Sequence, residues 1–522
     1  MGRYTVAVTT RMLKKGYLNV RNFVAHLLLG ALFALCGVGA AKADTTSTPS
    51  PKPAPTADVI KISGNARAFY FTRTNKFNCD SAGVGAGSIP QCNAAAFNVG
   101  GKLQAEYQFG TSPWIIGATY FAAEPFGANG NNPGFNPRVD NTLPGYALSL
   151  LGEYYLQYKN KYVNAQTGKE LINTPWAGPS DSRIVPTVYQ GTLLQGSVTR
   201  NLTLGAMYMA RFRHRVTSTF DSNTLLTSCA TVNPTGKVPG VVGPPFPAPP
   251  VAGNIPVPGD PCNPQRTTKG FLLFWGSQKL GANATLNLYN YNIYDLINLT
   301  HADIKYNYAP KSPMNPFVAA QYIAENDTGA AYLGTVHNHT FGMQISASFG
   351  KNVDLAFSLN AMPHELYVTT KCGLGPGGVF GGIKGGAVAG APAGTIYCYG
   401  GSVASPYSDS YATDPLYTTT ISQGLADVHK PGDAQKISGT FQTSNHRFKA
   451  IVAKAWYGYS LPVSGGTDAR QELNVDVQYF FNPVDPKKTY HGLSIRHRYA
   501  DRTQTGSPFD FKYNRTQLEF SF

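Results

Sequence analysis

The chain has little charge and, after its first 43 residues, no long hydrophobic run. Only 14% of its 522 residues are charged, and it contains just 7 cysteines, 7 methionines and 4 tryptophans. Beyond residue 43, no apolar stretch reaches the roughly 18 residues that a membrane-spanning helix requires. The remaining sequence is therefore not that of a helical membrane protein. Although the net charge is +15, the absence of a basic helix or binding motif argues against a nucleic-acid partner.

Aromatic residues and glycine are plentiful where charge is scarce. The sequence has 55 glycines, 31 tyrosines and 28 phenylalanines, yet its hydrophobic fraction of 42% is ordinary for a soluble protein. A transmembrane β-barrel combines these features, because lipid-facing and water-facing side chains alternate along each strand. Lipid can be crossed only by helices or closed barrels, so the sequence predicts an all-β, antiparallel transmembrane barrel.

The first 57 residues have the pattern of an export signal followed by a linker. Residues 1–22 carry basic side chains and no acidic ones, an apolar stretch runs from Phe23 to Ala40, and Ala41-Lys42-Ala43 supplies small residues for cleavage. We therefore expect a signal peptide over 1–43, a Pro-rich linker over 44–57 and a barrel over 58–522. The expected location is the bacterial outer membrane, after cleavage near Ala43.

Strict alternation of apolar and polar residues identifies the strands. From Phe341 to Phe349 every second residue is apolar, and the pattern resumes at Val353 after a three-residue turn. The last strand also alternates and ends on the aromatic Phe522, as closing strands of such barrels do. Eighteen strands are predicted, at 59–73, 96–109, 113–123, 145–158, 159–168, 188–198, 201–216, 269–280, 283–293, 296–308, 315–325, 338–349, 353–362, 434–443, 446–457, 470–482, 488–502 and 510–522.

Two of the outer connections are unusually long, at 216–268 and 363–434, and are rich in glycine and proline. Such residues contribute poorly to the hydrogen-bond ladders of sheets or to packed cores, so we expect irregular surface segments there.

Six cysteines lie outside the signal region, two in each of three outer loops, which favours local disulfides in an oxidising compartment. They lack the C-x-x-C spacing of many metal sites, and the sequence predicts no metal and no cofactor. The expected pairs are Cys79 with Cys92, Cys229 with Cys262, and Cys372 with Cys398.

Two motifs resemble a known family. The segment from Asn173 to Pro186, NTPWAGPSDSRIVP, resembles the third-loop signature of the OprD family of outer-membrane porins, and HGLSIRHRYA, from His491 to Ala500, resembles the penultimate-strand motif of that family. The resemblance implies an eighteen-stranded channel whose third loop folds inward. It also implies that small solutes bearing a carboxylate, often amino acids or aromatic acids, pass along a line of arginines.

Arginines occupy the positions that this resemblance implies. Arg183 lies in the loop motif, Arg496 and Arg498 alternate in the strand motif, and Arg502 follows in phase. Arginines two residues apart on a strand are spaced by about 6.6 Å, and each offers a planar fork of donors to a carboxylate. They could instead be merely solvated or paired with acidic residues. A second alternating set, which matches no motif, consists of Arg211, Arg213 and Arg215.

Opposing groups are expected at the constriction. Asp181, next to Ser182 in the loop motif, is the best candidate for a carboxylate facing the arginines, and Glu153 on the fourth strand is a second. Asp181 could instead stabilise a turn through its own side chain, as aspartate often does in this context.

The function predicted from these features is passive, selective diffusion of small carboxylates, without enzymatic activity. Two alternatives remain: a broader porin for sugars or chito-oligosaccharides, because tyrosine is abundant, and a surface enzyme or adhesin built on a closed barrel. The nearest cluster of catalytic residue types is His337-Asn338-His339, which no accompanying motif supports. Expected partners are outer-membrane lipid and lipopolysaccharide, the barrel-insertion machinery and small anionic or zwitterionic solutes, with the protein a monomer or weak homotrimer.

Overall fold

The computed structural model divides the chain into two compact units, Met1–Ala57 and Asp58–Phe522. The first unit, which holds the predicted signal peptide and linker, lies outside the described residues. In the second unit, the structure describes residues 58–75, 94–126, 143, 147–179, 184–213, 218–220, 222, 224, 268–373, 377–408, 414–421, 424–428, 431–460, 467–485, 489–504 and 510–522.

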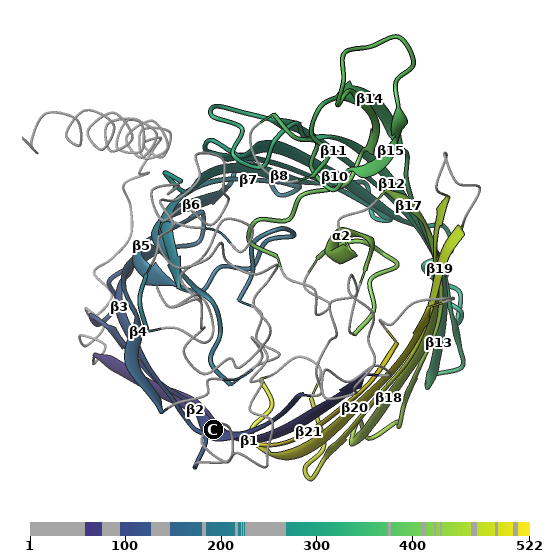
Figure 1. Cartoon of the computed structure of the whole chain (residues 1–522). Coiled ribbons are helices and arrows are strands. Elements are labelled where there is room, and N and C mark those ends of the chain that lie inside the picture. The colour runs from purple at the N-terminus through teal and green to yellow at the C-terminus, as the bar shows by residue number, and fades with distance from the viewer. Residues whose placement is uncertain are drawn as a thin grey trace, which may run out of the picture. The chain divides into compact units, whose positions relative to one another are not determined.

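Eighteen antiparallel strands form one closed sheet (Figure 1). Each predicted strand has a counterpart, so the predicted fold is confirmed. The strands are Val59–Asn75 (β1), Ala94–Gln108 (β2), Trp114–Glu124 (β3), Leu148–Lys159 (β4), Val163–Glu170 (β5), Val188–Ser197 (β6), Leu202–Arg213 (β7), Phe271–Leu280 (β8), Ala284–Ile293 (β9), Ile297–Asn307 (β10), Phe317–Asp327 (β11), His337–Phe349 (β12), Val353–Met362 (β13), Gly432–Gln442 (β17), Phe448–Ser460 (β18), Thr467–Phe480 (β19), Gly492–Gln504 (β20) and Phe511–Ser521 (β21).

The first and last strands close the barrel. β1 pairs with β21 from Asn65 opposite Ser521 to Asn75 opposite Phe511. At one end of this seam, the backbones of Gly64 and Phe522 exchange two hydrogen bonds, of 3.0 and 3.1 Å. The terminal aromatic residue is thus part of the seam. Closure leaves neither strand with an unpaired edge, as a barrel in lipid requires.

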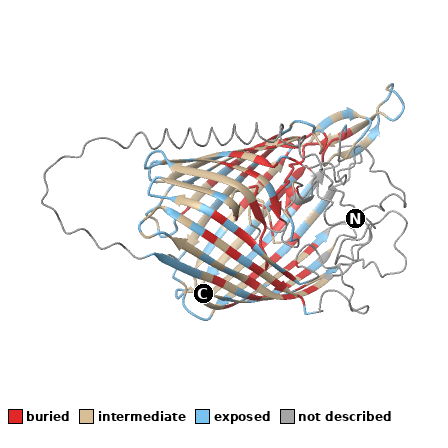
Figure 2. Cartoon of the chain, turned by 90° about the vertical axis from the view of Figure 1, so that its left-hand side faces the viewer, coloured by how far each residue is buried: buried red, intermediate tan, exposed pale blue. Residues whose placement is uncertain are grey.

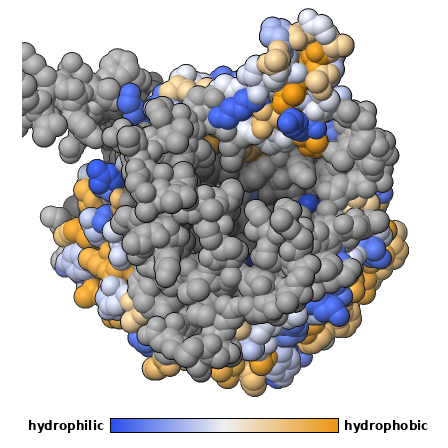
Figure 3. All heavy atoms as spheres, in the orientation of Figure 1, coloured by the Kyte–Doolittle hydropathy of each residue, from blue (hydrophilic) through white to orange (hydrophobic). Residues whose placement is uncertain are grey.

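Buried and exposed residues alternate along the strands of the barrel wall (Figure 2). On β12, Phe341, Met343 and Ile345 are exposed on the outer face, whereas the intervening Thr340 and Gly342 face the lumen. Hydrophobic side chains gather around the edge of the barrel when it is viewed along its axis (Figure 3). An apolar outer face of this kind suits a lipid environment. Among the described residues, no helix is long and apolar enough to cross a membrane.

The long connection between β13 and β17 differs from expectation, because it is largely ordered. Part of it forms a separate three-stranded sheet from Glu365–Thr369 (β14), Ile383–Ala387 (β15) and Ile396–Gly400 (β16), in the order β14-β16-β15. A disulfide joins Cys372 to Cys398 across this sheet. Glycines within β15 are tolerated there because only three short strands need to pair. The other four cysteines, Cys79, Cys92, Cys229 and Cys262, lie outside the described residues.

The described parts of the second half of that connection fold into the lumen instead of remaining at the surface. We call residues 401–428 the inner segment; it contains the four-residue helix Leu425–Val428 (α2), which lies inside the ring of strands (Figure 1). Gly401 begins it with φ of +108°, and a Cβ there would meet the carbonyl oxygen of Pro363. Its buried amides find acceptors on the wall: Ala404 N donates to Glu325 Oε2 at 2.7 Å, and Thr418 N donates to Asn360 Oδ1 at 3.0 Å.

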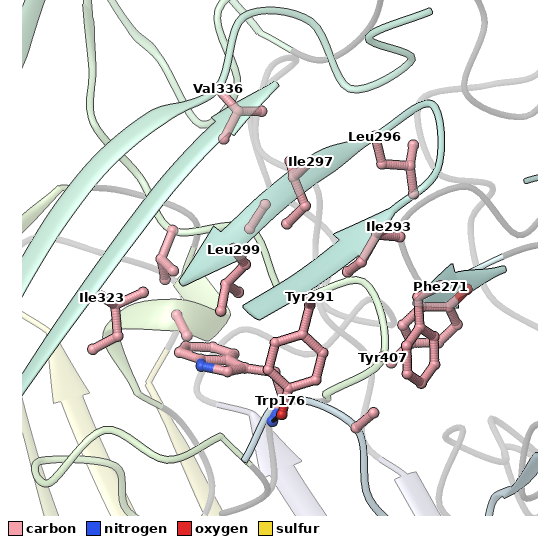
Figure 4. Close-up of a cluster of buried hydrophobic side chains, with 14 of the residues drawn as sticks. Trp176, Phe271, Tyr291, Ile293, Leu296, Ile297, Leu299, Ile323, Val336 and Tyr407 are labelled. Atoms are coloured by element: carbon pink, nitrogen blue, oxygen red, sulfur yellow. Dashed lines mark hydrogen bonds between the residues drawn. The ribbon is translucent and has the colours of Figure 1, made fainter. Parts of the chain in front are cut away.

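The connection between β5 and β6 also folds inward, as the sequence predicted for the third outer loop. We call its residues 171–187 the loop-3 segment. Ala177 of this segment forms a parallel bridge with Tyr407 of the inner segment, so the two segments meet within the lumen. A buried hydrophobic cluster surrounds their meeting point and includes Trp176, Phe271, Tyr291, Leu299 and Tyr407 (Figure 4). The main core of this barrel is therefore inside the lumen.

Candidate functional site: the charged wall of the lumen

Three of the predicted arginines share the lumen face of β20. Arg496, Arg498 and Arg502 are spaced by two and four residues, so strand geometry aims them to the same side. They differ in exposure: Arg502 is buried, Arg498 is largely buried, and Arg496 keeps 26% of its side chain accessible. Among these three, Arg496 is thus the most available to a solute.

One carboxylate on the neighbouring strand β19 holds two of these arginines. Asp476 accepts from Arg496 Nε at 2.7 Å and from a terminal nitrogen of the same guanidinium at 2.5 Å. It also accepts from Arg498 Nε at 2.9 Å. The pairing that the sequence left open is therefore present, and it fixes both guanidinium groups against the wall. A charge-assisted, two-pronged contact of this type orients the donors that remain on each fork.

The charged wall continues across β21 and β1, for which no functional arginine was predicted. Arg515 of β21 lies opposite Arg498, and its guanidinium stacks 4.6 Å from the Phe69 ring centroid. Arg67 of β1 forms an ion pair with Glu519 at 3.0 Å. We define the arginine wall as the lumen faces of β19, β20, β21 and β1. On the described residues of these faces, arginines outnumber carboxylates, so the local field favours anions.

These additional arginines carry a sequence signal that is easy to miss. Arg515, Gln517 and Glu519 alternate in the last strand, which predicts that they face the lumen. A single arginine among them does not indicate that it belongs to a row of arginines. The pairing of β20 with β21 places Arg515 opposite Arg498. Only the pairing of β1 with β21 brings Arg67 to Glu519, because these two strands lie more than 400 residues apart in sequence.

The second predicted set of arginines does not extend the wall as one row. Arg211 is exposed, whereas Arg213 is fully buried, and its guanidinium donates to the Pro186 carbonyl at 2.5 Å and lies 5.8 Å from the Phe121 ring centroid. A register shift between Gln190 and Gly191, where β6 pairs with β7, interrupts the simple alternation. Arg213 therefore anchors the end of the loop-3 segment. Arg215 lies outside the described residues.

Glu153 occupies the lumen side of β4 and is almost completely buried. Its Oε1 accepts a hydrogen bond from the backbone of Leu171 at 3.1 Å, at the start of the loop-3 segment. This contact gives Glu153 a role in positioning the loop. The predicted loop residues Asp181, Ser182 and Arg183 lie outside the described residues, so their opposition to the arginine wall stays a prediction.

The loop-3 segment is attached to two regions of the wall. At one end, Trp176 Nε1 donates to His301 Nδ1 of β10 at 3.1 Å, and Trp176 N donates to the Tyr291 hydroxyl of β9 at 3.2 Å. At the other end, Ile184 and Val185 belong to a second buried cluster with Phe69 and Phe121. Since β9 and β10 are remote from β1 and β3 in the sheet, the two described parts of the segment, 171–179 and 184–187, contact different sides of the lumen.

Comparison with known proteins supports the resemblance. A family model described as outer membrane porin, OprD family, matches residues 151–361. That range includes the loop-3 segment, so the resemblance to this family is confirmed there; the penultimate-strand motif from His491 to Ala500 lies outside the matched range. No curated protein matches the chain.

Several solved structures share this fold. OccK9 (OpdG) of Pseudomonas aeruginosa is 15% identical, with 89% of this chain and 98% of that chain covered at a TM-score of 0.59. OccK2 (OpdF) of Pseudomonas aeruginosa, solved in complex with glucuronate, is 14% identical with the same coverage and a TM-score of 0.58. OccAB2 of Acinetobacter baumannii is 15% identical, again over 89% and 98%, with a TM-score of 0.60. At such low identity, these structures establish the fold alone.

Proposed function

We propose that this chain, whose residues 151–361 match the OprD family of outer membrane porins, is itself such a porin and lets small carboxylate-bearing solutes diffuse through its lumen along the arginine wall. The observation that carries the proposal is the placement of Arg496 and Arg498 beside Arg515 on adjacent lumen-facing strands. A guanidinium is charged at any working pH and binds a carboxylate with paired donors. Successive sites let an anion move from one arginine to the next without binding too tightly to any one of them.

The inward-folded segments support a selective passage. The loop-3 segment and the inner segment pack hydrophobic residues against the lumen faces of β6 to β11, β13, β17 and β18. A solute is then expected to travel beside the arginine wall, on the other side of the lumen. One solved structure of this fold, OccK2, was obtained with glucuronate, a sugar acid, which makes glucuronate a suitable first probe here.

The sugar-porin alternative receives less support from the placement of aromatic residues. Tyr189, Tyr291, Tyr407 and Trp176 are buried in the cluster where the two inner segments meet. Stacking of sugars on aromatic side chains requires accessible ring faces, which these four do not offer. A neutral trisaccharide therefore serves as the discriminating probe, with block by the sugar favouring the alternative.

The proposal is tested by planar-bilayer recording of single channels from the purified protein. We expect a reversal potential in a salt gradient that indicates anion preference, and current interruptions by benzoate and glucuronate but not by the trisaccharide. Arg496→Ala should weaken carboxylate block about 3- to 10-fold, as expected for the loss of one charge-assisted contact. An unchanged reversal potential in that variant would exclude the arginine wall as the selective element.

A matched control removes a cation from the outer face of the barrel. Lys454 is exposed on the outer face of β18, with its ammonium group 5.4 Å from the Trp456 ring centroid. Lys454→Ala changes the net charge by the same amount as Arg496→Ala but leaves the lumen intact. It should leave both selectivity and carboxylate block at wild-type values.

A further inference from the structure

Two histidines stand where the barrel wall meets the outer sheet. His337 and His339 lie at the start of β12, at the end of the barrel that carries the long connections, and their alternation places both on the same side as the exposed Phe341. β14 brings Glu365 to His337 from the three-stranded sheet. The catalytic alternative considered for His337-Asn338-His339 finds no support, because Asn338 points to the opposite side and donates to the Gly401 carbonyl.

The two imidazoles converge through one nitrogen each. His337 Nε2 and His339 Nε2 are 3.3 Å apart, and the rings are nearly perpendicular. Histidine binds zinc with a metal–nitrogen distance of about 2.0 to 2.1 Å, and a tetrahedral angle then separates two ligand nitrogens by about 3.3 Å. The observed separation therefore matches two ligands of one tetrahedral ion.

The other nitrogen of each ring already has a partner that fixes its orientation. The Glu365 carboxylate lies 2.5 Å from His337 Nδ1, and the Tyr322 hydroxyl lies 2.6 Å from His339 Nδ1. Tyr367 in turn donates to Glu365 at 2.7 Å. Metal-binding histidines characteristically use their second nitrogen in this way, with a carboxylate or another polar group that sets the tautomer and the ring orientation.

From this geometry we propose that His337 and His339 bind a divalent transition-metal ion through their Nε2 atoms. Imidazole suits Zn²⁺, Cu²⁺ and Ni²⁺ more than Ca²⁺ or Mg²⁺, which prefer oxygen ligands. Glu365 orients His337 and contributes negative charge; one ligand atom from each of the three residues fits within a span of 4.8 Å. Water completes the coordination, so the ion remains exchangeable.

Such a site would lie beside the contact between the outer sheet and the barrel wall. Glu365 belongs to β14, whereas His337 and His339 belong to β12. Near the same place, Thr335 forms a bridge with Val379 of the long connection, and the disulfide between Cys372 and Cys398 braces the sheet internally. The link between sheet and wall is the hydrogen bond between Glu365 and His337 Nδ1. A metal ion on His337 Nε2 would strengthen this bond, because coordination makes the imidazole a better donor, so the contact would depend on metal supply.

The test is a zinc titration of the full-length protein, extracted from membranes in detergent and purified without a polyhistidine tag. After chelator treatment and buffer exchange, binding is measured by competition with a chromogenic zinc chelator. We expect one equivalent of Zn²⁺ to bind. His337→Gln and His339→Gln should each weaken binding at least tenfold, and Tyr322→Phe should weaken it less, because its hydroxyl only orients His339.

His497→Gln is the matched control, since His497 is an exposed histidine on the outer face of β20 that bonds only Thr516 among the contacts described here. It should bind zinc like the wild type. Heat-dependent electrophoretic mobility verifies that each variant forms a barrel. The proposal fails if the wild type binds no zinc, or if the two histidine variants bind it as the control does; the 3.3 Å contact is then a histidine–histidine hydrogen bond.

Discussion

At the scale of single residues, Asp476 controls how strongly the arginine wall presents positive charge. It accepts three hydrogen bonds from Arg496 and Arg498, so a passing carboxylate competes with it for the same guanidinium groups. This competition keeps solute binding weak enough for release. The carboxylate therefore acts as a built-in counterion, and the arginines are held in position even when no solute is present.

Removing that counterion should have the opposite effect to removing an arginine. Asp476→Asn keeps the side-chain size and one acceptor oxygen but removes the negative charge. We expect anion preference to rise and carboxylate dissociation to slow about 3- to 10-fold, measured as longer current interruptions by benzoate. Asp501→Asn, on the outward-facing position of β20, is the control. Shorter interruptions in Asp476→Asn would contradict this role.

Asp414, in the inner segment, links the stability of that segment to pH. Burial raises the pKa of this carboxyl to about 6, although Thr419 and the Leu416 amide donate to it and Lys436 is nearby. The folded segment therefore binds the proton more tightly than the unfolded chain does. Stability is greatest below the unfolded pKa of about 4 and falls as the pH rises to about 6, by at most about 3 kcal/mol.

Hydrogen exchange of residues 414–421, corrected for the intrinsic rate at each pH, measures this effect. Protection should be higher at pH 4.5 than at pH 7.5 in the wild type. Asp414→Asn, which cannot ionise, should reduce the difference between the two pH values. Equal pH dependence in the variant would mean that another group is responsible.

At the scale of elements, two connections between strands became part of the interior. Trp176 is only 1% exposed and joins the loop-3 segment to β9 and β10 through two hydrogen bonds. Its aromatic surface fills the cluster that also receives Tyr407 from the inner segment. Because Trp176 packs in this cluster instead of contacting solvent, it holds the loop-3 segment at one position in the lumen.

Truncating this anchor should loosen the constriction. Trp176→Ala is expected to cost the cluster about 3 to 5 kcal/mol, as is typical for a buried aromatic, and to raise single-channel conductance and current noise. Trp114→Ala is the matched control, because Trp114 is 44% exposed on the outer face of β3. Conductance at the wild-type level in Trp176→Ala would show that the loop-3 segment does not depend on this anchor.

The disulfide between Cys372 and Cys398 adds an internal cross-link to the outer sheet of β14, β15 and β16, besides the contact of Glu365 with His337 of the barrel. The cysteines are separated by 26 residues, so the cross-link restricts the unfolded loop by about 3.5 kcal/mol in the chain-entropy model. Cys372→Ser should therefore make residues 365–400 sensitive to protease while leaving the barrel resistant. Equal protease resistance of wild type and variant would assign the sheet's stability to its ladder alone.

At the scale of the whole molecule, closure of the barrel depends on the pairing of β1 with β21. If this seam is lost, two strands present unpaired backbone groups, which are costly in lipid. A chain that starts at residue 58 keeps β1 and should retain heat-dependent electrophoretic mobility. A chain that starts at residue 76 lacks β1 and should lose it. Retention of the folded mobility in the shorter chain would mean that β2 can close the barrel on β21.

The sequence by itself determined the architecture, because alternation is a local property. The polar residues between Phe341, Met343 and Ile345 show that these three side chains share the outer face of a strand. Eighteen segments with this alternation predict a closed barrel, and the structure has one. The alternating Arg496, Arg498 and Arg502 were also visible, since a strand of known phase places them on one face. Their ion pairs were left open, because Asp476 lies on another strand.

Only the tertiary structure decided what fills the lumen and which charges meet there. Arg67 joins the arginine wall because the chain closes on itself, and Arg213 is buried against the Pro186 carbonyl instead of extending the predicted ladder. Residues 401–428 were expected at the surface on account of their composition. They fold inward because Tyr407 and Leu425 find apolar surface on the wall and Trp176 of the loop-3 segment. Such long-range pairings leave no periodic signal in the sequence.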